Sequence, residues 1–116
     1  MRRFMKRAIA ADQGSVPLFS DFEDDGPMWS GTGPREARRA IAFAEPFLSP
    51  PIVHVSLSMW DVHHATNMRA EIVAENITER GFDLVFRTWS DTRIARMRAD
   101  WLAIGALAHE DDWNVD

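Results

Sequence analysis

Alternation of apolar and polar side chains along short stretches is the feature of this sequence that most limits its fold. Between Ile52 and Trp60, the apolar residues Val53, Val55 and Leu57 take every second position, with His or Ser between them. Successive side chains of a β-strand point to opposite faces, so this pattern predicts a strand with one buried face. Weaker or comparable runs occupy 15–22, 37–43, 69–77, 82–89 and 95–103. Trp60 and Trp101 are expected only to pack, and Trp101 alternates in phase with Ala99 and Ala103, which predicts a core position.

Six short strands with little helix favour an all-β chain, a six-stranded antiparallel β-sandwich in a single domain. Each sheet of such a sandwich turns one face to the core and the other to water or a partner. One stretch keeps an alternative, because residues 35–44 also have the composition of a helix. Residues 23–35 hold three Gly and two Pro, which predicts a loop without regular structure.

The ends of the chain differ in charge from its middle. We divide the sequence into a basic N-terminal lead-in at 1–14, a β-sandwich at 15–107 and an acidic C-terminal tail at 108–116. The apolar stretch after the first basic residues is too short for a secretory signal, which predicts cytoplasmic synthesis without a signal peptide. The final location stays open, with a particle or a cell surface as the alternatives. No run reaches ~18 apolar residues, which argues against membrane insertion.

Composition excludes several classes of function. The net charge of −5, from 13 basic and 18 acidic residues, argues against a nucleic-acid partner. The absence of cysteine excludes disulfides, thiolate metal sites and a Cys nucleophile. No catalytic signature is present, so we expect neither an enzyme nor a cofactor. The histidines His54, His63 and His64 with Asp61, and the acidic stretch 21–25, are interpreted as solvated groups and not as a metal site.

The turn at 78–81 fixes how the runs 69–77 and 82–89 pair. A hairpin turning about residue 79 joins positions whose numbers sum to about 158, which sets Arg69 opposite Trp89 on the outward face. A guanidinium can stack on an indole there. The same two groups suit a sugar, because the indole covers the C–H face of a pyranose and the guanidinium donates hydrogen bonds to hydroxyls.

Polar residues surround this aromatic side chain: Thr88 precedes Trp89, and Ser90 and Asp91 follow it. The alternative is a surface or subunit-interface pair, because Trp and Arg are also favoured at interfaces. In both cases a large aromatic side chain on the outer face needs a ligand or a partner chain to cover it.

The sequence resembles the H-type lectin domain, the domain of the snail agglutinins and of the C-terminal part of the discoidins. The resemblance spans about residues 35–105, and its elements together are more specific than any one alone. The matching stretches are Phe43-Ala44-Glu45-Pro46-Phe47, Pro50-Pro51-Ile52-Val53, Asp61, Asn67-Met68-Arg69, Gly81-Phe82, Thr88-Trp89-Ser90-Asp91-Thr92 and Trp101-Leu102-Ala103-Ile104.

The resemblance implies a trimer, which in snail members can double to a hexamer, and a sugar site at the boundary between protomers. It places the sugar-contacting Arg on Arg69 and the aromatic on Trp89. The implied ligand is galactose or N-acetylgalactosamine. The snail lectin has His where Ser90 stands, and the neighbour's Gly and Asp fall near Ser30 and Thr32, where there is no carboxylate. These departures leave the sugar open.

The sequence therefore supports two hypotheses. In the first, the chain is a multivalent carbohydrate-binding module, with Trp29 as a second aromatic beside the site, on a phage-tail-like particle or appendage. In the second, it is a trimerisation or assembly module that keeps the lectin scaffold without binding sugar. Trp29 and Trp89 would then be buried against another protein.

Overall fold

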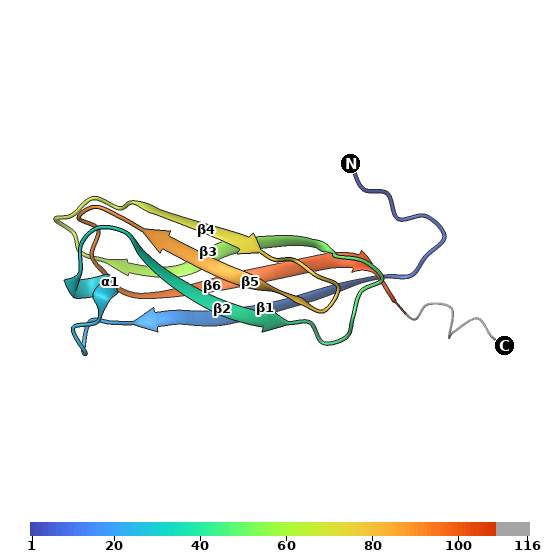
Figure 1. Ribbon diagram of the computed structural model, residues 1–116, viewed down its shortest axis with the longest axis horizontal. Helices are drawn as coiled ribbons and strands as arrows, with labels where there is room; N and C mark the ends of the chain where they lie inside the picture. Colours follow the sequence, from blue (N-terminus) through green and yellow to red (C-terminus); the bar gives the residue numbers. More distant parts are fainter. Residues whose placement is uncertain (109–116) are drawn as a thin grey trace.

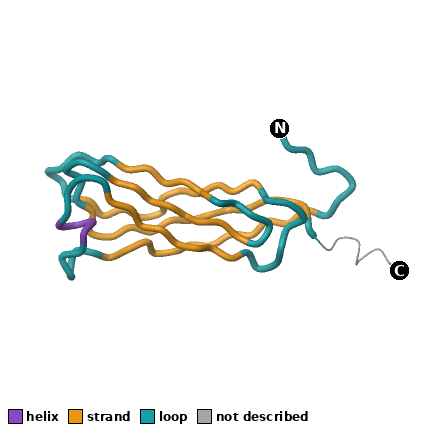
Figure 2. The backbone as a smooth tube through the Cα atoms, viewed as in Figure 1, coloured by secondary structure: helices purple, strands orange, loops and turns teal. Residues whose placement is uncertain are grey.

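The structure is a computed structural model of the chain, and it describes residues 1–108. Six strands form two three-stranded antiparallel sheets that lie face to face (Figures 1 and 2). The β6 sheet has the order β1-β6-β3, and the β5 sheet has the order β2-β5-β4. The elements are β1 (Ile9–Ser20), α1 (Pro27–Ser30), β2 (Arg35–Ala42), β3 (Ile52–Val62), β4 (Ala70–Glu75), β5 (Gly81–Thr88) and β6 (Ile94–Ala106). The all-β sandwich is thus confirmed.

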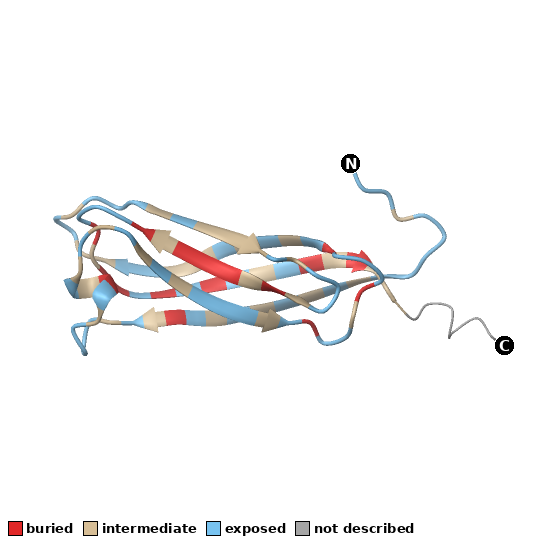
Figure 3. Cartoon of the chain, viewed as in Figure 1, coloured by how far each residue is buried: buried red, intermediate tan, exposed pale blue. Residues whose placement is uncertain are grey.

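The core lies between the sheets, on the alternate positions that the sequence predicts to be apolar. Leu84 and Phe86 from β5 and Met97 and Ala99 from β6 are fully buried. Figure 3 shows this burial along the central strands of both sheets. Trp101 also packs on the core, as expected from its phase. Its indole lies so close to β1 that a side chain at Gly14 would collide with it, which explains a glycine in mid-strand.

Three expectations need correction. The first strand begins at Ile9, inside the range assigned to the lead-in, because Ile9 to Ser20 pair with β6 almost without interruption. The predicted loop contains the helical turn α1, since Pro27 has the fixed φ of a first helical position and Asp21 accepts a hydrogen bond from the Met28 backbone. Trp60, expected only to pack, is 60% exposed.

The ambiguous stretch at 35–44 contains the strand β2, which pairs with β5 from Arg35 to Ala42. Pairing along a whole strand outweighs the helical composition. His109 to Asp116, most of the predicted acidic tail, lie outside the described residues. Among residues 1–108 no helix is long and apolar enough to cross a membrane.

All connections that carry the predicted site residues lie at one end of the sandwich. The β1–β2 connection with α1, the β3–β4 loop and the β5–β6 loop meet there, on the left in Figure 1. The N-terminus and the end of β6 lie at the opposite end. The loop end is therefore free to meet a ligand away from the chain ends.

Candidate functional site

The register of the β4–β5 hairpin brings Arg69 and Trp89 together as predicted. Ala70 pairs with Thr88, so the next positions outward, Arg69 and Trp89, lie opposite each other. Both are exposed, Trp89 at 40%. The Thr88 hydroxyl donates a 2.6 Å hydrogen bond to the Arg69 carbonyl, which fastens the two chain segments at this point.

A buried threonine holds the neighbouring loops in place. Thr92 is 0% exposed, and its Oγ1 donates to the Asn67 carbonyl at 2.6 Å. The same oxygen accepts from the Arg69 backbone N–H at 2.9 Å. One hydroxyl thus ties the β3–β4 loop to the β5–β6 loop and sets the backbone from which the Arg69 side chain projects.

Asp91 precedes Thr92 in the chain, and its carboxylate is an ionised hydrogen-bond acceptor. Its carboxylate accepts from the backbone and side-chain amides of Asn67, each at 3.4 Å. The hydrogen bonds from Asn67, with a contribution from the positive charge of Arg69, hold the pKa of the Asp91 carboxyl below its usual value. Asp91 is exposed, so it remains in contact with water at the loop end.

Arg35 organises the loop end, and sequence reasoning missed it. Its guanidinium donates to the carbonyls of Gly33 at 2.9 Å, Thr92 at 2.8 Å and Ser90 at 3.2 Å. Partial burial lowers its pKa from the ordinary value. Ser90, with φ at +61°, also accepts from the Gly33 N–H at 2.9 Å. The loop carrying Ser90 is therefore fixed by hydrogen bonds to its backbone. The only feature of the sequence that could have indicated this role of Arg35 is its place at the end of a Gly- and Pro-rich loop.

A shallow hollow of about 400 Å³ lies beside Trp89. The indole forms an apolar wall, and the side chains of Glu71 and Arg87 stand on the polar side. The full lining is Pro34, Arg35, Glu36, Glu71, Arg87, Thr88 and Trp89. An aromatic wall beside fixed acceptors and donors is the arrangement of a small polar-ligand site.

Trp29 does not join this hollow within the chain. Its ring packs edge-to-face on Phe22, with 5.0 Å between the ring centres, and its ring centre lies 5.7 Å from that of His63. The Arg93 guanidinium carbon lies 4.4 Å from the Trp29 ring centre. Among residues 1–108, a guanidinium thus stacks on an indole at Arg93 and Trp29. Arg69 and Trp89 lie opposite each other but do not make the stacking contact considered from the sequence.

The other two predicted residues of this loop are placed by α1. The Ser30 hydroxyl donates to the carbonyls of Asp25 at 2.7 Å and Gly26 at 3.0 Å, so it is used in the loop itself. Thr32 is exposed. The structure therefore groups Arg69, Trp89, Ser90 and Asp91, and sets Trp29, Ser30 and Thr32 apart on the β1–β2 connection.

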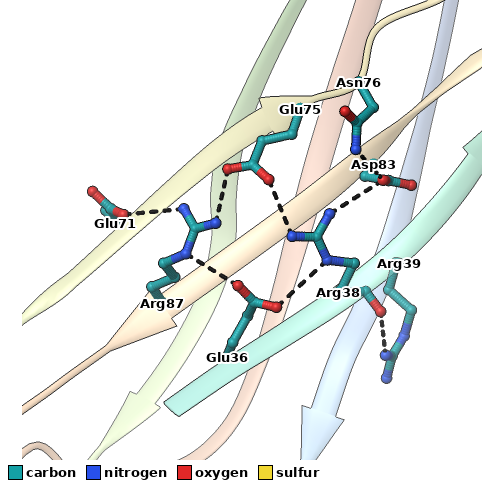
Figure 4. A network of polar contacts seen from close by, with 8 residues as sticks. All are labelled: Glu36, Arg38, Arg39, Glu71, Glu75, Asn76, Asp83 and Arg87. Atoms are coloured by element: carbon teal, nitrogen blue, oxygen red, sulfur yellow. Dashed lines mark hydrogen bonds and ion pairs between the residues drawn. The ribbon is translucent and has the colours of Figure 1, made fainter. Parts of the chain in front are cut away.

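A network of ion pairs covers the outer face of the β5 sheet (Figure 4). At its centre Glu75 accepts from Arg87 at 2.8 Å and from Arg38 at 3.1 Å. These hydrogen bonds lower the pKa of Glu75. The members are Glu36, Arg38, Glu71, Glu75, Asp83 and Arg87. The long side chains lie over Val85, which faces outward and is nevertheless 0% exposed.

The sequence pattern of the H-type lectin domain matches residues 38–104. The chain belongs to the H-type lectin domain family. Discoidin-2 of Dictyostelium discoideum is 40% identical over 81 residues, which are 69% of this chain and 32% of that protein. A protein of Fuscovulum blasticum described as "ATP synthase subunits region ORF 7" is 57% identical over 109 residues, 94% of this chain and 95% of its own length.

A solved structure has the same fold. Wild-type discoidin II from Dictyostelium discoideum superposes with a TM-score of 0.73 at 33% identity, over 85% of this chain and 37% of that one. The H-type lectin chain thus spans about a third of the length of the discoidins it matches. These comparisons confirm the family and the fold predicted from the sequence. The fold is that of a lectin-like carbohydrate-binding domain and not that of an enzyme.

Proposed function

We propose that this H-type lectin chain binds carbohydrate at the Trp89 indole, with Arg69, which lies opposite Trp89 and outside the lining of the hollow, as the main hydrogen-bond donor. The observation that carries the proposal is the exposed indole opposite an exposed arginine, on a backbone fixed by Thr88 and Thr92. The Arg69 side chain makes no hydrogen bond or ion pair within the described residues, so its donors are available. A pyranose would place its C–H face on the indole and its hydroxyls towards the guanidinium.

Acceptors for sugar hydroxyls would come from carboxylates already at the site. The sequence places no carboxylate at Ser30 or Thr32, but Glu71 lines the hollow and Asp91 is exposed beside Arg69. A carboxylate makes strong hydrogen bonds to hydroxyl donors. Galactose or N-acetylgalactosamine is the sugar that the family resemblance suggests, and these carboxylates are suited to such vicinal hydroxyls.

The proposal includes a homotrimer with sites at protomer boundaries, and a hexamer as its doubled form. The hollow is shallow and open in a single chain, and Trp89 remains 40% exposed. Ser30 and Thr32 stand on the exposed β1–β2 connection at the same end, where they could meet a neighbour. Linking several weak sites raises avidity by ~10²–10⁴. Display on a particle or cell surface would use that avidity.

One observation favours the second function, an assembly module. Ile9, Ile52 and Leu102 are all exposed large apolar residues on the β6 sheet. Apolar groups gathered on a sheet face are typical of a surface that another protein covers. This surface lies on a different sheet from the Arg69–Trp89 hairpin, so assembly and sugar binding need not exclude each other.

A glycan array probed with the wild type and with Trp89→Ala tests the proposal. We expect selective binding by the wild type and a loss of about five- to tenfold in the variant, because an indole stacked on a sugar contributes ~1–1.4 kcal/mol. The matched control is Trp60→Ala, which removes an even more exposed indole from the other sheet. Silence of the wild type, with its oligomer intact by light scattering, would contradict sugar binding and favour assembly.

A further inference from the structure

A second hollow lies at the loop end, and it shares no residue with the one beside Trp89. It has a volume of about 490 Å³. It forms where β1 and β3 end and β6 begins, and its lining includes Phe22 and Trp29 from the β1–β2 connection, Asp61 from β3 and Arg96 from β6. All of its lining residues belong to a single chain.

The aromatic side of this groove is held in place. Phe22 and Trp29 contact each other edge-to-face at 5.0 Å, and Phe22 remains 56% exposed. Arg93 does not line the groove, but its guanidinium lies over the Trp29 ring and its Nε donates to the Trp29 carbonyl at 2.9 Å. The indole is therefore oriented before any ligand arrives, which lowers the entropy cost of binding.

The polar side carries unused donors and acceptors. Arg96 Nε donates to Asp61 Oδ2 at 3.2 Å, in an ion pair that is more than half exposed. The terminal nitrogens of Arg96 and the second oxygen of Asp61 make no hydrogen bond within residues 1–108. His63 also lines the groove, and its Nδ1 accepts from the Ala65 N–H at 3.2 Å.

The charges of the groove identify the class of ligand. Its lining contains one arginine, Arg96, and two carboxylates, Asp61 and Glu23, with Arg93 behind the indole. The lining thus carries charges of both signs, so a net anion would meet the carboxylates and a net cation would meet Arg96. This favours a neutral ligand. Paired acceptor and donor next to an aromatic wall match the vicinal hydroxyls and the C–H face of a neutral pyranose.

We propose that this groove is a second carbohydrate subsite, complete within each chain, that takes a neutral pyranose between the aromatic pair and the Asp61–Arg96 pair. It deepens the proposed function, on which it rests for the class of ligand. Each protomer would then contact a glycan at two places on the loop end, one near each sheet.

Fluorine NMR on the full chain labelled with 5-fluorotryptophan tests this subsite. The sequence has five Trp, so each signal can be assigned by a single Trp→Phe variant. The probes are the methyl glycosides of galactose, glucose, mannose and N-acetylgalactosamine. We expect at least one to shift the Trp29 signal, while the signal of the exposed Trp60, which lines neither hollow, stays in place.

Two variants separate the subsites. Arg96→Ala changes an exposed side chain, so folding is not at risk. It should raise the dissociation constant read at Trp29 about tenfold, which is the effect of losing one charged hydrogen bond. It should leave the Trp89 response unchanged. Arg69→Ala should do the reverse. No Trp29 shift with any of the sugars overturns the subsite. A Trp29 shift lost in Arg69→Ala but kept in Arg96→Ala also overturns it, because Trp29 would then report a neighbour's site. A Trp29 response without a Trp89 response supports the subsite and contradicts the proposed function.

Discussion

At the scale of single residues, a few buried groups position the exposed ones that meet the ligand. Thr92 is the clearest case, since its hydroxyl joins the Asn67 carbonyl to the Arg69 N–H at a fully buried position. Thr92 cannot touch a sugar itself. Its effect on binding therefore passes through the backbone that carries Arg69.

Thr92→Val is expected to lower both stability and sugar binding. Valine keeps the volume but removes both part-buried hydrogen bonds of the Thr92 hydroxyl, which costs about 1–3 kcal/mol of unfolding free energy. Denaturant unfolding measures the first effect, and titration with the best sugar from the array measures the second. Thr92→Ser, which retains the hydroxyl, should recover most of both. Unchanged sugar binding in a destabilised Thr92→Val variant would show that the hydrogen bonds of the Thr92 hydroxyl do not position Arg69.

Residue-scale prediction from sequence succeeded where local rules suffice. The opposition of Arg69 and Trp89 follows from strand alternation and the length of one turn, and both are local. The side chain of Arg35 binds loop carbonyls more than fifty positions away in the sequence, and Trp29 packs on His63 from another loop. Such contacts depend on how loops meet in space, which no local pattern shows.

At the scale of elements, the six strands were predictable because their apolar faces repeat at every second residue. The boundaries of the strands were less predictable. β1 begins at Ile9 because its pairing with β6 starts before the stretch in which apolar and polar residues clearly alternate. The turn α1 was missed because Pro27 and the glycines around it are common to loops and to helix starts. The ion-pair network of the β5 sheet also needs the register of three strands, and a single strand does not reveal it.

That network makes the β5 sheet sensitive to acid. The hydrogen bonds from Arg87 and Arg38 lower the pKa of Glu75 in the folded chain. A lowered folded pKa gives stability that is present above the unfolded pKa of about 4.3–4.5 and is lost as pH falls through the folded value. Glu75→Gln should therefore be less stable than the wild type at pH 7, and the difference should shrink as the pH falls below about 4.

Urea unfolding at a series of pH values measures this difference. The control is Glu45→Gln, which removes a carboxylate that is exposed and outside the network. Its difference from the wild type should not change over the same pH range. A Glu75→Gln difference that is the same at pH 7 and pH 3 would mean that the network adds no pH-dependent stability.

At the scale of the whole molecule, the sandwich separates two ends. The loop end carries Arg69, Trp89 and the groove at Trp29, while the basic N-terminal segment lies at the other end (Figure 1). A lectin attached through its N-terminal end would present all its candidate sugar contacts in one direction. In a trimer with parallel chains, these contacts would form one surface that suits a dense glycan layer.

The most direct test of sugar binding at Trp89 is a crystal structure of the oligomer grown with the sugar that the array selects. We expect a pyranose ring against the Trp89 indole, with Arg69 within hydrogen-bond distance of its hydroxyls and the 30–32 segment of a neighbour on its far side. A structure in which a neighbouring chain covers Trp89 and leaves no room for a sugar ring would contradict it, and would make the chain an assembly module on a lectin scaffold.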